Sequence, residues 1–142
     1  MFEINLYEYV ETGFPLSNVS DPLVDFSGIV VGFGGVPEAT TAPYVVMYVL
    51  DSNGDPVTLC DSQYDSGNSF VQFNVVANST EKAFYIKQKL GEFLTQTRYL
   101  TGGTVSYTID RTTHGASPSA QTLTNGLAVD VLAKTFNYTK VI

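Results

Sequence analysis

Several segments of the chain alternate between apolar and polar residues with a period of two, which indicates β-strands. Residues 70–76 and 104–109 alternate in this way, and residues 123–138 form a final strand of the same kind. Residues 29–33 predict a shorter extended segment. Residues 44–50, "YVVMYVL", are apolar or aromatic at every position, so we expect a central strand that is covered on both faces.

The stretch "DSNGDP", residues 51–56, predicts a turn directly after that central strand. Asn53-Gly54 is a strong hairpin signal because both residues tolerate positive φ, and residues 57–60 would return as the partner strand. Acidic and amide side chains also alternate here, but an EF-hand calcium loop needs glycine at its sixth position and glutamate at its twelfth. Gly54 is at the fourth position and Ser62 at the twelfth, so the hairpin is favoured.

Two helices are predicted from apolar residues that recur every three or four positions. The first covers residues 2–12 and ends at Gly13 and Pro15, although its first residues also alternate as a strand would. The second begins after Asn78, whose side chain would cap the exposed amides, and reaches Gln96. Its apolar stripe consists of Ala83, Ile86, Leu90, Phe93 and Leu94.

Three loops of small and polar residues separate these elements, at residues 36–43, 61–69 and 111–121. Loops of about ten residues inside a small domain are often functional, and here they offer contact residues rather than chemistry. The candidate interface residues are Glu38, Thr40, Tyr64, Asp65, Arg111 and His114. The order of elements predicts one α+β domain over residues 1–142, an antiparallel (mixed) β-sheet with one long helix packed on one face and an N-terminal helix.

The charge of the chain narrows the possible partners. The 142 residues include 14 acidic and 7 basic side chains, for a formal net charge of −7, which argues against nucleic-acid binding. The longest apolar run has the length of a strand, so no membrane helix is expected. The first residues lack the basic start and apolar core of a signal peptide. Synthesis and retention in a reducing cytoplasm are expected, which fits the single cysteine.

Candidate chemistry is sparse. The single histidine, His114, lies in a Gly/Ser/Pro-containing loop. The single cysteine, Cys60, lies in a predicted strand, where a buried, inert thiol is favoured. One histidine and one cysteine are too few for a zinc site built from these ligands. "GFGG", residues 32–35, lacks the spacing and the following helix of a phosphate-binding loop. We therefore predict no catalytic residue, cofactor or metal, although spacing does not exclude a hydrolase that uses Cys60 and His114. Five tyrosines could line a sugar-binding surface, but core packing is favoured: Tyr7, Tyr9, Tyr44, Tyr48 and Tyr64.

The order of motifs resembles the tail-terminator, or tail-completion, proteins of long-tailed bacteriophages. An N-terminal helix with "LYEYV" leads to "GIVVGFGGVPEATTAPYVVMYVL", in which a proline-rich loop ends at "PY" and opens the central strand. The strand at the start of "FVQFNVVANSTEKAFYIKQKLGEFL" then runs directly into a capped helix, and "LAVDVLAKTFNY" closes the pattern. The resemblance covers about residues 2–138. It departs from the family in lacking a tryptophan near the strand before the helix, and in its long loop at residues 111–121.

This resemblance implies a structural virion protein that is made in the host bacterial cytoplasm. Such a subunit forms a ring, usually a homohexamer, that caps the head-proximal end of the tail tube and stops its polymerisation. Its implied partners are further copies of itself, the tail-tube protein and the head-completion or connector protein at the neck. Genomic DNA would only pass through the channel, because an acidic ring would not bind the DNA.

Other functions remain open from the sequence. A head–tail joining or neck protein and a tail-tube subunit share the ring architecture, although the single long helix favours a terminator over a tube protein. A small carbohydrate-binding adhesion module belongs to a different class and would use the tyrosines and acidic loops. The hydrolase with Cys60 and His114 is the enzymatic alternative.

Overall fold

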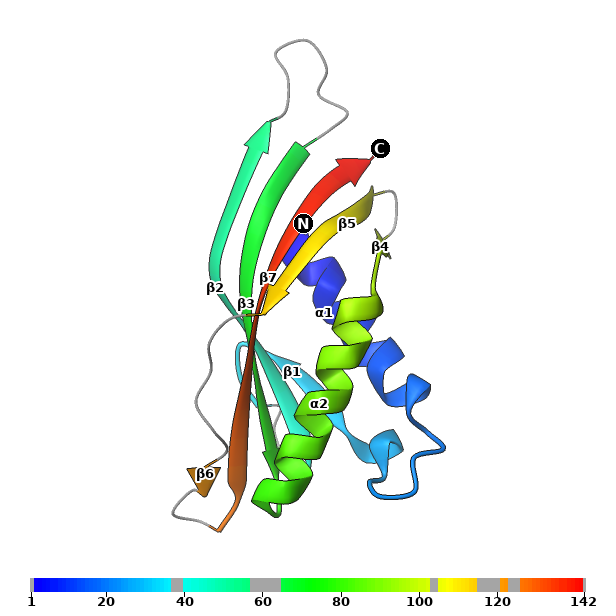
Figure 1. Ribbon diagram of the computed structural model, residues 1–142, viewed down its shortest axis with the longest axis vertical. Coiled ribbons are helices and arrows are strands. Elements are labelled where there is room, and N and C mark those ends of the chain that lie inside the picture. Colours follow the sequence, from blue (N-terminus) through cyan, green and yellow to red (C-terminus); the bar gives the residue numbers. More distant parts are fainter. Residues whose placement is uncertain are drawn as a thin grey trace.

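The chain folds as an α+β unit in which a curled mixed sheet carries two helices on one face, as the sequence predicts (Figure 1). The helices are α1 (Phe2–Ser17) and α2 (Thr80–Gln96). A short 3₁₀ turn, η1 (Phe26–Gly28), lies between α1 and the sheet in chain order. The computed structural model describes residues 2–36, 40–56, 65–102, 105–114, 121–122 and 126–141, and side chains at positions 52–56, 65, 102, 105, 114 and 121 are outside this description.

The sheet has the strand order β1-β2-β3-β7-β5-β4, so the last strand of the chain lies in its middle. β1 pairs with β2 in parallel, and the other pairs are antiparallel. The two-residue β6 pairs with the start of β7. The strands are β1 (Val30–Phe33), β2 (Tyr44–Pro56), β3 (Asp65–Ala77), β4 (Tyr99–Gly102), β5 (Val105–His114), β6 (Gln121–Thr122) and β7 (Ala128–Val141).

The turn predicted at Asn53-Gly54 is wrong. These residues continue β2 and pair with Asn68 and Gly67 of β3, beyond a bulge between Val49 and Asp51. A turn preference is local, whereas each further antiparallel pair adds ladder hydrogen bonds that favour extension. The return strand predicted at residues 57–60 lies outside the described residues.

Two predicted loops are partly strand. Asp65 begins β3 and pairs with Pro56, so the loop prediction at residues 61–69 is wrong from this residue onward. Likewise, Arg111 to His114 belong to β5 and pair with β7, although we expected a loop from Arg111. Polar residues look like loop in the sequence, but pairing with the long β7 satisfies their backbone groups. For the same reason β7 extends to Val141, past its predicted end at residue 138.

Helix α2 reaches Gln96 as predicted, but its cap is Ser79 rather than Asn78. The Ser79 hydroxyl accepts a hydrogen bond from the Lys82 backbone N–H at 3.2 Å, and Ser79 itself has extended backbone angles, as an N-cap requires. Asn78 therefore lies one position outside the cap. β3 thus passes directly into a capped helix after Ala77.

Helix α1 continues past its predicted end at Gly13 and Pro15 and stops at Ser17. Gly13 has a different role from the helix terminator we expected. A Cβ atom at this position would lie 3.1 Å from the ring of Phe93 on α2, so the missing side chain lets the two helices approach closely. Helix packing, not local propensity, accounts for this glycine.

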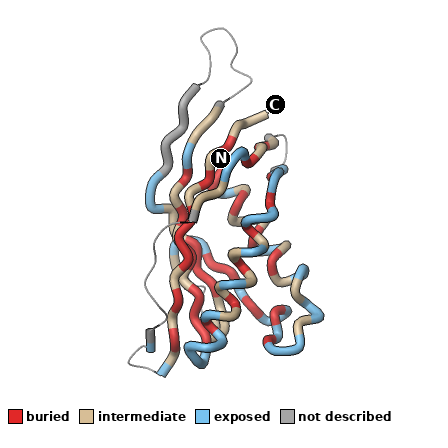
Figure 2. Tube along the Cα trace, in the orientation of Figure 1, coloured by how far each residue is buried: buried red, intermediate tan, exposed pale blue. Residues whose placement is uncertain are grey.

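The hydrophobic core lies between the sheet and the two helices, where buried residues concentrate (Figure 2). α2 contributes the apolar stripe that its spacing predicts, except that Phe93 is only partly buried. At the other end, Phe2 of α1 stacks on Tyr138 with ring centroids 4.1 Å apart. The largest fully buried side chains are Phe2, Phe14, Phe26, Phe73, Phe136, Leu6, Met47, Ile86, Leu90, Leu94, Leu100 and Leu132.

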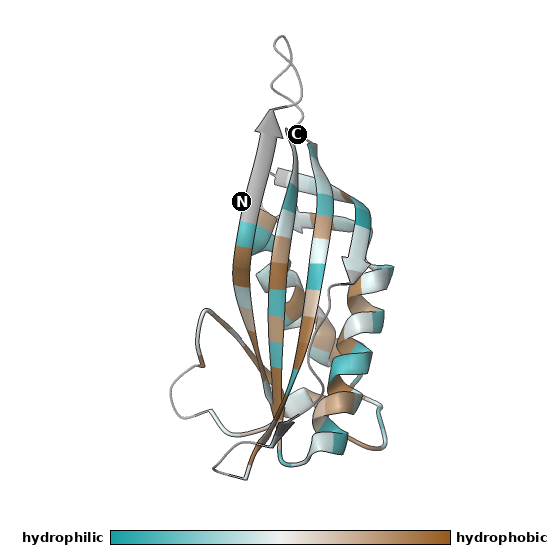
Figure 3. Ribbon diagram, turned by 60° about the vertical axis from the view of Figure 1, so that its left-hand side comes forward, coloured by the Kyte–Doolittle hydropathy of each residue, from teal (hydrophilic) through white to brown (hydrophobic). Residues whose placement is uncertain are grey.

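The central strand is covered on both faces over only part of its predicted length. Val45 and Met47 face the core, and Val46 on the opposite face is only 2% exposed. Tyr48 is half-buried and Leu50 is 51% exposed, so the cover ends near the β2 bulge. Apolar and polar residues then alternate along the long strands, as Figure 3 shows.

Candidate assembly surfaces

The predicted interface residues do not form one site. Glu38 and Tyr64 lie outside the described residues. Thr40 is half-buried and precedes the start of β2, whereas Asp65 pairs with the last residue of that strand. Since β2 has 13 residues and a strand rises roughly 3.3 Å per residue, about 40 Å separates its two ends. Thr40 and Asp65 therefore lie near opposite ends of β2.

Arg111 and His114 both belong to β5, and Arg111 lies close to the end of α2. The exposed Arg111 lines a small polar hollow of about 160 Å³, which also includes Arg98 and Asp110. The remaining lining residues are Thr95, Ile109 and Thr112. The Arg98 side chain is held here because its guanidinium donates to the carbonyl of Thr95 at 2.5 Å, and the Arg98 carbonyl accepts from the Ile109 N–H at 2.8 Å.

The charge in this hollow is not balanced within the described part of the chain. The Asp110 carboxylate accepts from the hydroxyl of Thr139 at 2.7 Å and from that of Thr108 at 3.4 Å. The ion pairs among the described residues involve other side chains, so neither arginine has an acidic partner there. A guanidinium with free N–H groups is suited to bind a carboxylate.

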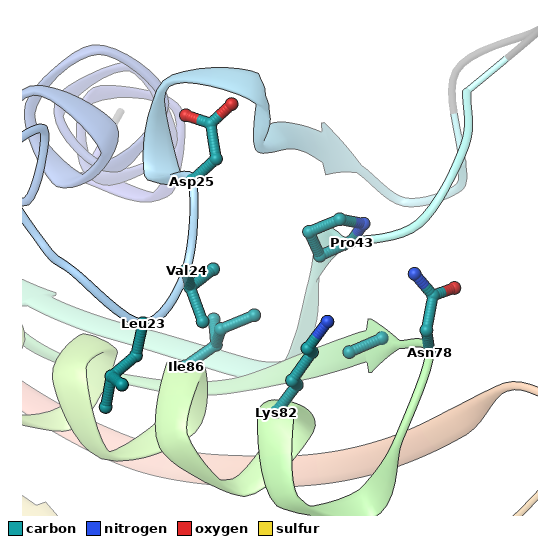
Figure 4. A pocket seen from close by; sticks show the side chains of 8 residues that line it. Leu23, Val24, Asp25, Pro43, Asn78, Lys82 and Ile86 are labelled. Atoms are coloured by element: carbon teal, nitrogen blue, oxygen red, sulfur yellow. The ribbon is translucent and has the colours of Figure 1, made fainter.

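A second hollow, of about 180 Å³, lies between the segment before η1, the start of β2 and the first turn of α2 (Figure 4). Leu23 and Val24 line one side, and Pro43 and Lys82 line the other. Asp25 is also present, but its carboxylate caps η1 by accepting from the backbone N–H of Ser27. With one lysine and otherwise mostly apolar walls, this hollow has no nucleophile paired with a base.

Two charged residues in the core were not predicted as sites. The Lys87 ammonium lies 3.1 Å from Asp130 Oδ1, and the Asp130 side chain is fully buried. Asp130 Oδ2 has no hydrogen-bond partner among the described residues. Lys134, four positions along β7, is 6% exposed, and burial lowers the pKa of its ammonium. In the sequence, a charge at a core-facing position of an alternating strand is the signal that marks both residues.

The tyrosines considered for sugar binding are divided between different surfaces. The Tyr7 hydroxyl on α1 contacts Glu11 at 2.5 Å, and burial together with this carboxylate raises the pKa of Tyr7 to about 12. Tyr9 stacks on Phe93, with centroids 5.1 Å apart. Tyr44 and Tyr48 instead lie on β2, on the sheet face that points away from the helices. The four described tyrosines therefore do not form one aromatic platform.

The segment after α1 is fixed by side-chain contacts to α2. The Tyr85 hydroxyl donates to Asp21 Oδ2 at 2.5 Å, and this hydrogen bond lowers the pKa of Asp21 and raises that of Tyr85. Asp21 Oδ1 also accepts from the backbone N–H groups of Leu23 and Val24. Asp21 thus closes a side-chain-to-backbone turn.

The described residues contain no group of three or more histidine, cysteine, aspartate or glutamate side chains placed to hold a metal ion. In the same ranges, neither helix combines the length and the apolar character required to cross a bilayer. The Cys60–His114 pair stays untested, because Cys60 and the His114 side chain lie outside the description. No protein-family model matches this chain, and no curated protein matches it either.

Proposed function

We propose that this chain is a structural virion protein, a tail terminator that forms a ring, with six copies as the expected number. The ring caps the head-proximal end of a phage tail tube, stops tube polymerisation and provides the docking surface for the head or neck connector. It acts in the virion at the junction of tail and neck. Its partners are its own copies, the tube protein and the connector, and DNA passes through its channel.

The observation that supports this proposal most directly is the junction between β3 and α2. β3 ends at Ala77 and α2 begins at Thr80 under the Ser79 cap, following a β2 that opens after Pro43. This is the sequence of elements that the resemblance to tail terminators requires. An N-terminal helix packed beside α2 belongs to the same pattern.

The strand lengths also favour a protein that assembles with other subunits over one that acts as a monomer. β2, β3 and β7 have 13, 13 and 14 residues, whereas strands in globular proteins typically have about five or six. Helix α2, with 17 residues at about 1.5 Å each, is roughly 26 Å long and covers little more than half of such a strand. The described side chains of β2 and β3 beyond the β2 bulge contribute no residue to the hydrophobic core, and this part of the sheet is surface that neighbouring subunits can use.

The proposal is tested by imaging particles made without this protein. Tails of uncontrolled length, or tails without heads, are expected, and wild-type protein supplied separately should restore normal tails. Complete virions that fail only to attach to cells would instead support the adhesion module. A normal tail length with heads that do not join would shift the assignment to a head–tail joining protein.

A matched variant tests the enzymatic alternative in the same assay. Cys60→Ser removes the thiol that a Cys60–His114 hydrolase would need, with little change in side-chain volume. We expect this variant to restore tails as well as the wild-type protein does. Loss of restoration by a soluble, folded Cys60→Ser protein would contradict the structural assignment.

A further inference from the structure

The sheet has two open edges, and they carry opposite charge. β1 covers β2 only from Tyr44 to Met47, so the outer edge of β2 from Tyr48 to Pro56 has no partner strand among the described residues. On the opposite side, β4 pairs with β5 up to Thr108, and the Ile109 N–H donates to the Arg98 carbonyl, so residues 110–114 have no outer partner strand in the described part of the chain. Open edges of this length present unpaired backbone N–H and C=O groups and readily accept a further strand.

The edge formed by β2 is acidic. Asp51 is exposed at the β2 bulge, next to the exposed Leu50. By sequence, residues 51–65 hold Asp at positions 51, 55, 61 and 65 and contain no lysine or arginine. Like-charge repulsion between two such acidic segments disfavours their contact, whereas a basic surface on another copy would attract them.

The edge formed by β5 carries the arginine hollow. Arg111 is exposed and pairs in register with Asn137 of β7, which in turn pairs with Asn68 and, through it, Asn53. Asp51 lies two positions before Asn53 and pairs with Phe70, and residues two apart on a strand point to the same side of a sheet, as paired residues of adjacent strands do. Asp51 and Arg111 therefore lie on one face of the sheet, at its two edges.

The residues between these two edges are uncharged. On the face that points away from the helices, the register places Tyr, Val, Phe, Gln, Asn, Ala and Thr side chains. A polar contact within that face joins the Gln72 amide to Asn74 Oδ1 at 2.8 Å. An acidic edge, an uncharged centre and a basic edge make this face complementary to itself when copies associate head to tail.

We propose that the open edge of β2, led by Asp51, binds to Arg111 and residues 110–114 of β5 in a second copy of this chain. β2, β3, β7 and β5 alternate in direction, so β2 of one copy runs antiparallel to β5 of the next when both sheets have the same orientation. The contact is heterologous, with different surfaces on the two copies, and repeated contacts of this kind close into a ring. The inference rests on the proposed ring function and names the surfaces that form the ring.

Charge reversal at the two exposed residues tests this contact by native mass spectrometry and light scattering. Arg111→Glu and Asp51→Lys should each raise the dissociation constant between copies about a hundredfold, because each places like charges in contact. An equal mixture of the two variants should restore assemblies with one-to-one composition, since every contact in an alternating ring then joins opposite charges. Lys82→Glu and Glu8→Lys change charge by the same amounts at exposed positions on the two helices and should have no effect.

The outcomes separate this contact from the function itself. If both variants assemble like the wild-type protein, the contact is wrong, while the terminator role still depends on tail lengths. If the mixture does not restore assembly although both variants are folded by circular dichroism, the pairing of Asp51 with Arg111 is wrong. If the wild-type protein stays monomeric at every concentration and on isolated tail tubes, a contact between copies through these edges is overturned.

Discussion

The long strands β2, β3 and β7 are paired along their whole described length, but the two halves of this three-stranded region differ in amino-acid composition. The bulge in β2 divides them. The core half consists of residues 44–49 of β2, 71–77 of β3 and 128–134 of β7, and the distal half consists of residues 51–56, 65–70 and 135–141 of the same strands.

In the core half, all three strands bury aliphatic or aromatic side chains under the helices, such as Val45, Phe73 and Leu132. In the distal half, buried apolar contacts come from β7 and β5, through Phe136, Tyr138 and Tyr107 around Phe2. Ser69 is the buried residue of β3 there, and its hydroxyl has no hydrogen-bond partner among the described residues. The core half thus buries apolar side chains on all three long strands, whereas the described apolar core residues of the distal half come from β7, β5 and α1.

The largest expected effect is a loss of stability that differs between the two halves of β3. Phe73→Ala in the core half removes a fully buried ring and should lower the free energy of unfolding by about 4 kcal/mol. Asn68→Ala, five positions away in the distal half, truncates an exposed side chain and should change it by less than about 0.5 kcal/mol. Denaturant unfolding of both variants checks this. Equal losses would show that the distal half is as important for stability as the core half.

The buried ion pair gives the next largest effect. Asp130→Ala leaves the Lys87 ammonium without its acidic partner and should lower the free energy of unfolding by about 2 kcal/mol. The loss is smaller than for a fully buried pair because the Lys87 side chain is partly exposed to solvent. The double variant Lys87→Met with Asp130→Leu should recover most of this loss, because it leaves no charge behind. Thermal unfolding of the single and double variants measures the difference. A double variant less stable than Asp130→Ala would contradict this account.

The N-cap of α2 should contribute less to the free energy of unfolding than the buried ion pair does, and its effect should be confined to the core half. Ser79→Ala leaves the Lys82 N–H without its acceptor and should cost about 1 kcal/mol. Asn78→Ala is the matched control, since Asn78 was the predicted cap and lies one residue outside it. Hydrogen exchange should show faster opening of the first turn of α2 in Ser79→Ala. A larger effect of Asn78→Ala would restore the sequence prediction.

The smallest effect concerns Lys134, at the boundary between the halves. Burial favours the neutral amine, so the folded-state pKa lies below the ordinary 10.5, and the unfolded chain binds more protons between these two values. The stability of the wild-type protein therefore gains from this group as pH rises through that window. Lys134→Met should be more stable by about 0.5 kcal/mol near pH 7, since it removes the buried charge.

The measurement for Lys134 is the difference in unfolding free energy between variant and wild type as a function of pH. This difference should shrink as pH rises toward 10.5, where the wild-type ammonium loses its proton in both states. A difference that stays constant with pH would indicate a packing effect of methionine rather than a charge effect. Thr95→Val provides a control that leaves the buried charge in place. It removes the weak 3.4 Å contact to the Lys134 ammonium and the 2.7 Å hydrogen bond that the Thr95 hydroxyl donates to the Gly91 carbonyl.

Sequence periodicity predicts the core half well and the distal half poorly. The apolar run from Tyr44 and the stripe on α2 have strong signals, because burial on a sheet or helix face selects apolar residues at a fixed spacing. Beyond the bulge, Asn53 and Gly54 look like a turn although they pair with Asn68 and Gly67. Their extended state depends on the neighbouring strands, which no local pattern encodes.

The candidate surfaces were predictable only in part. Arg111 was named from its loop-like surroundings, and the structure places it in a hollow with a second arginine, Arg98, which lies two positions after the last residue of α2. The two residues are brought together because Ile109 of β5 hydrogen-bonds to the Arg98 carbonyl. Such a long-range contact leaves no spacing signal in the sequence. The acidic composition of residues 51–65, by contrast, can be read directly.

The position of β7 has a consequence for how the protein is made. β7 is the last strand in chain order but lies between β3 and β5 in the sheet, and Val75 pairs with Asp130, which is 55 positions later in the sequence. While the ribosome is still adding residues before Ala128, β3 has only β2 beside it and its other edge is uncovered. Nascent or truncated chains therefore expose a long strand edge that invites aggregation, and the sheet is completed only after synthesis of its final strand.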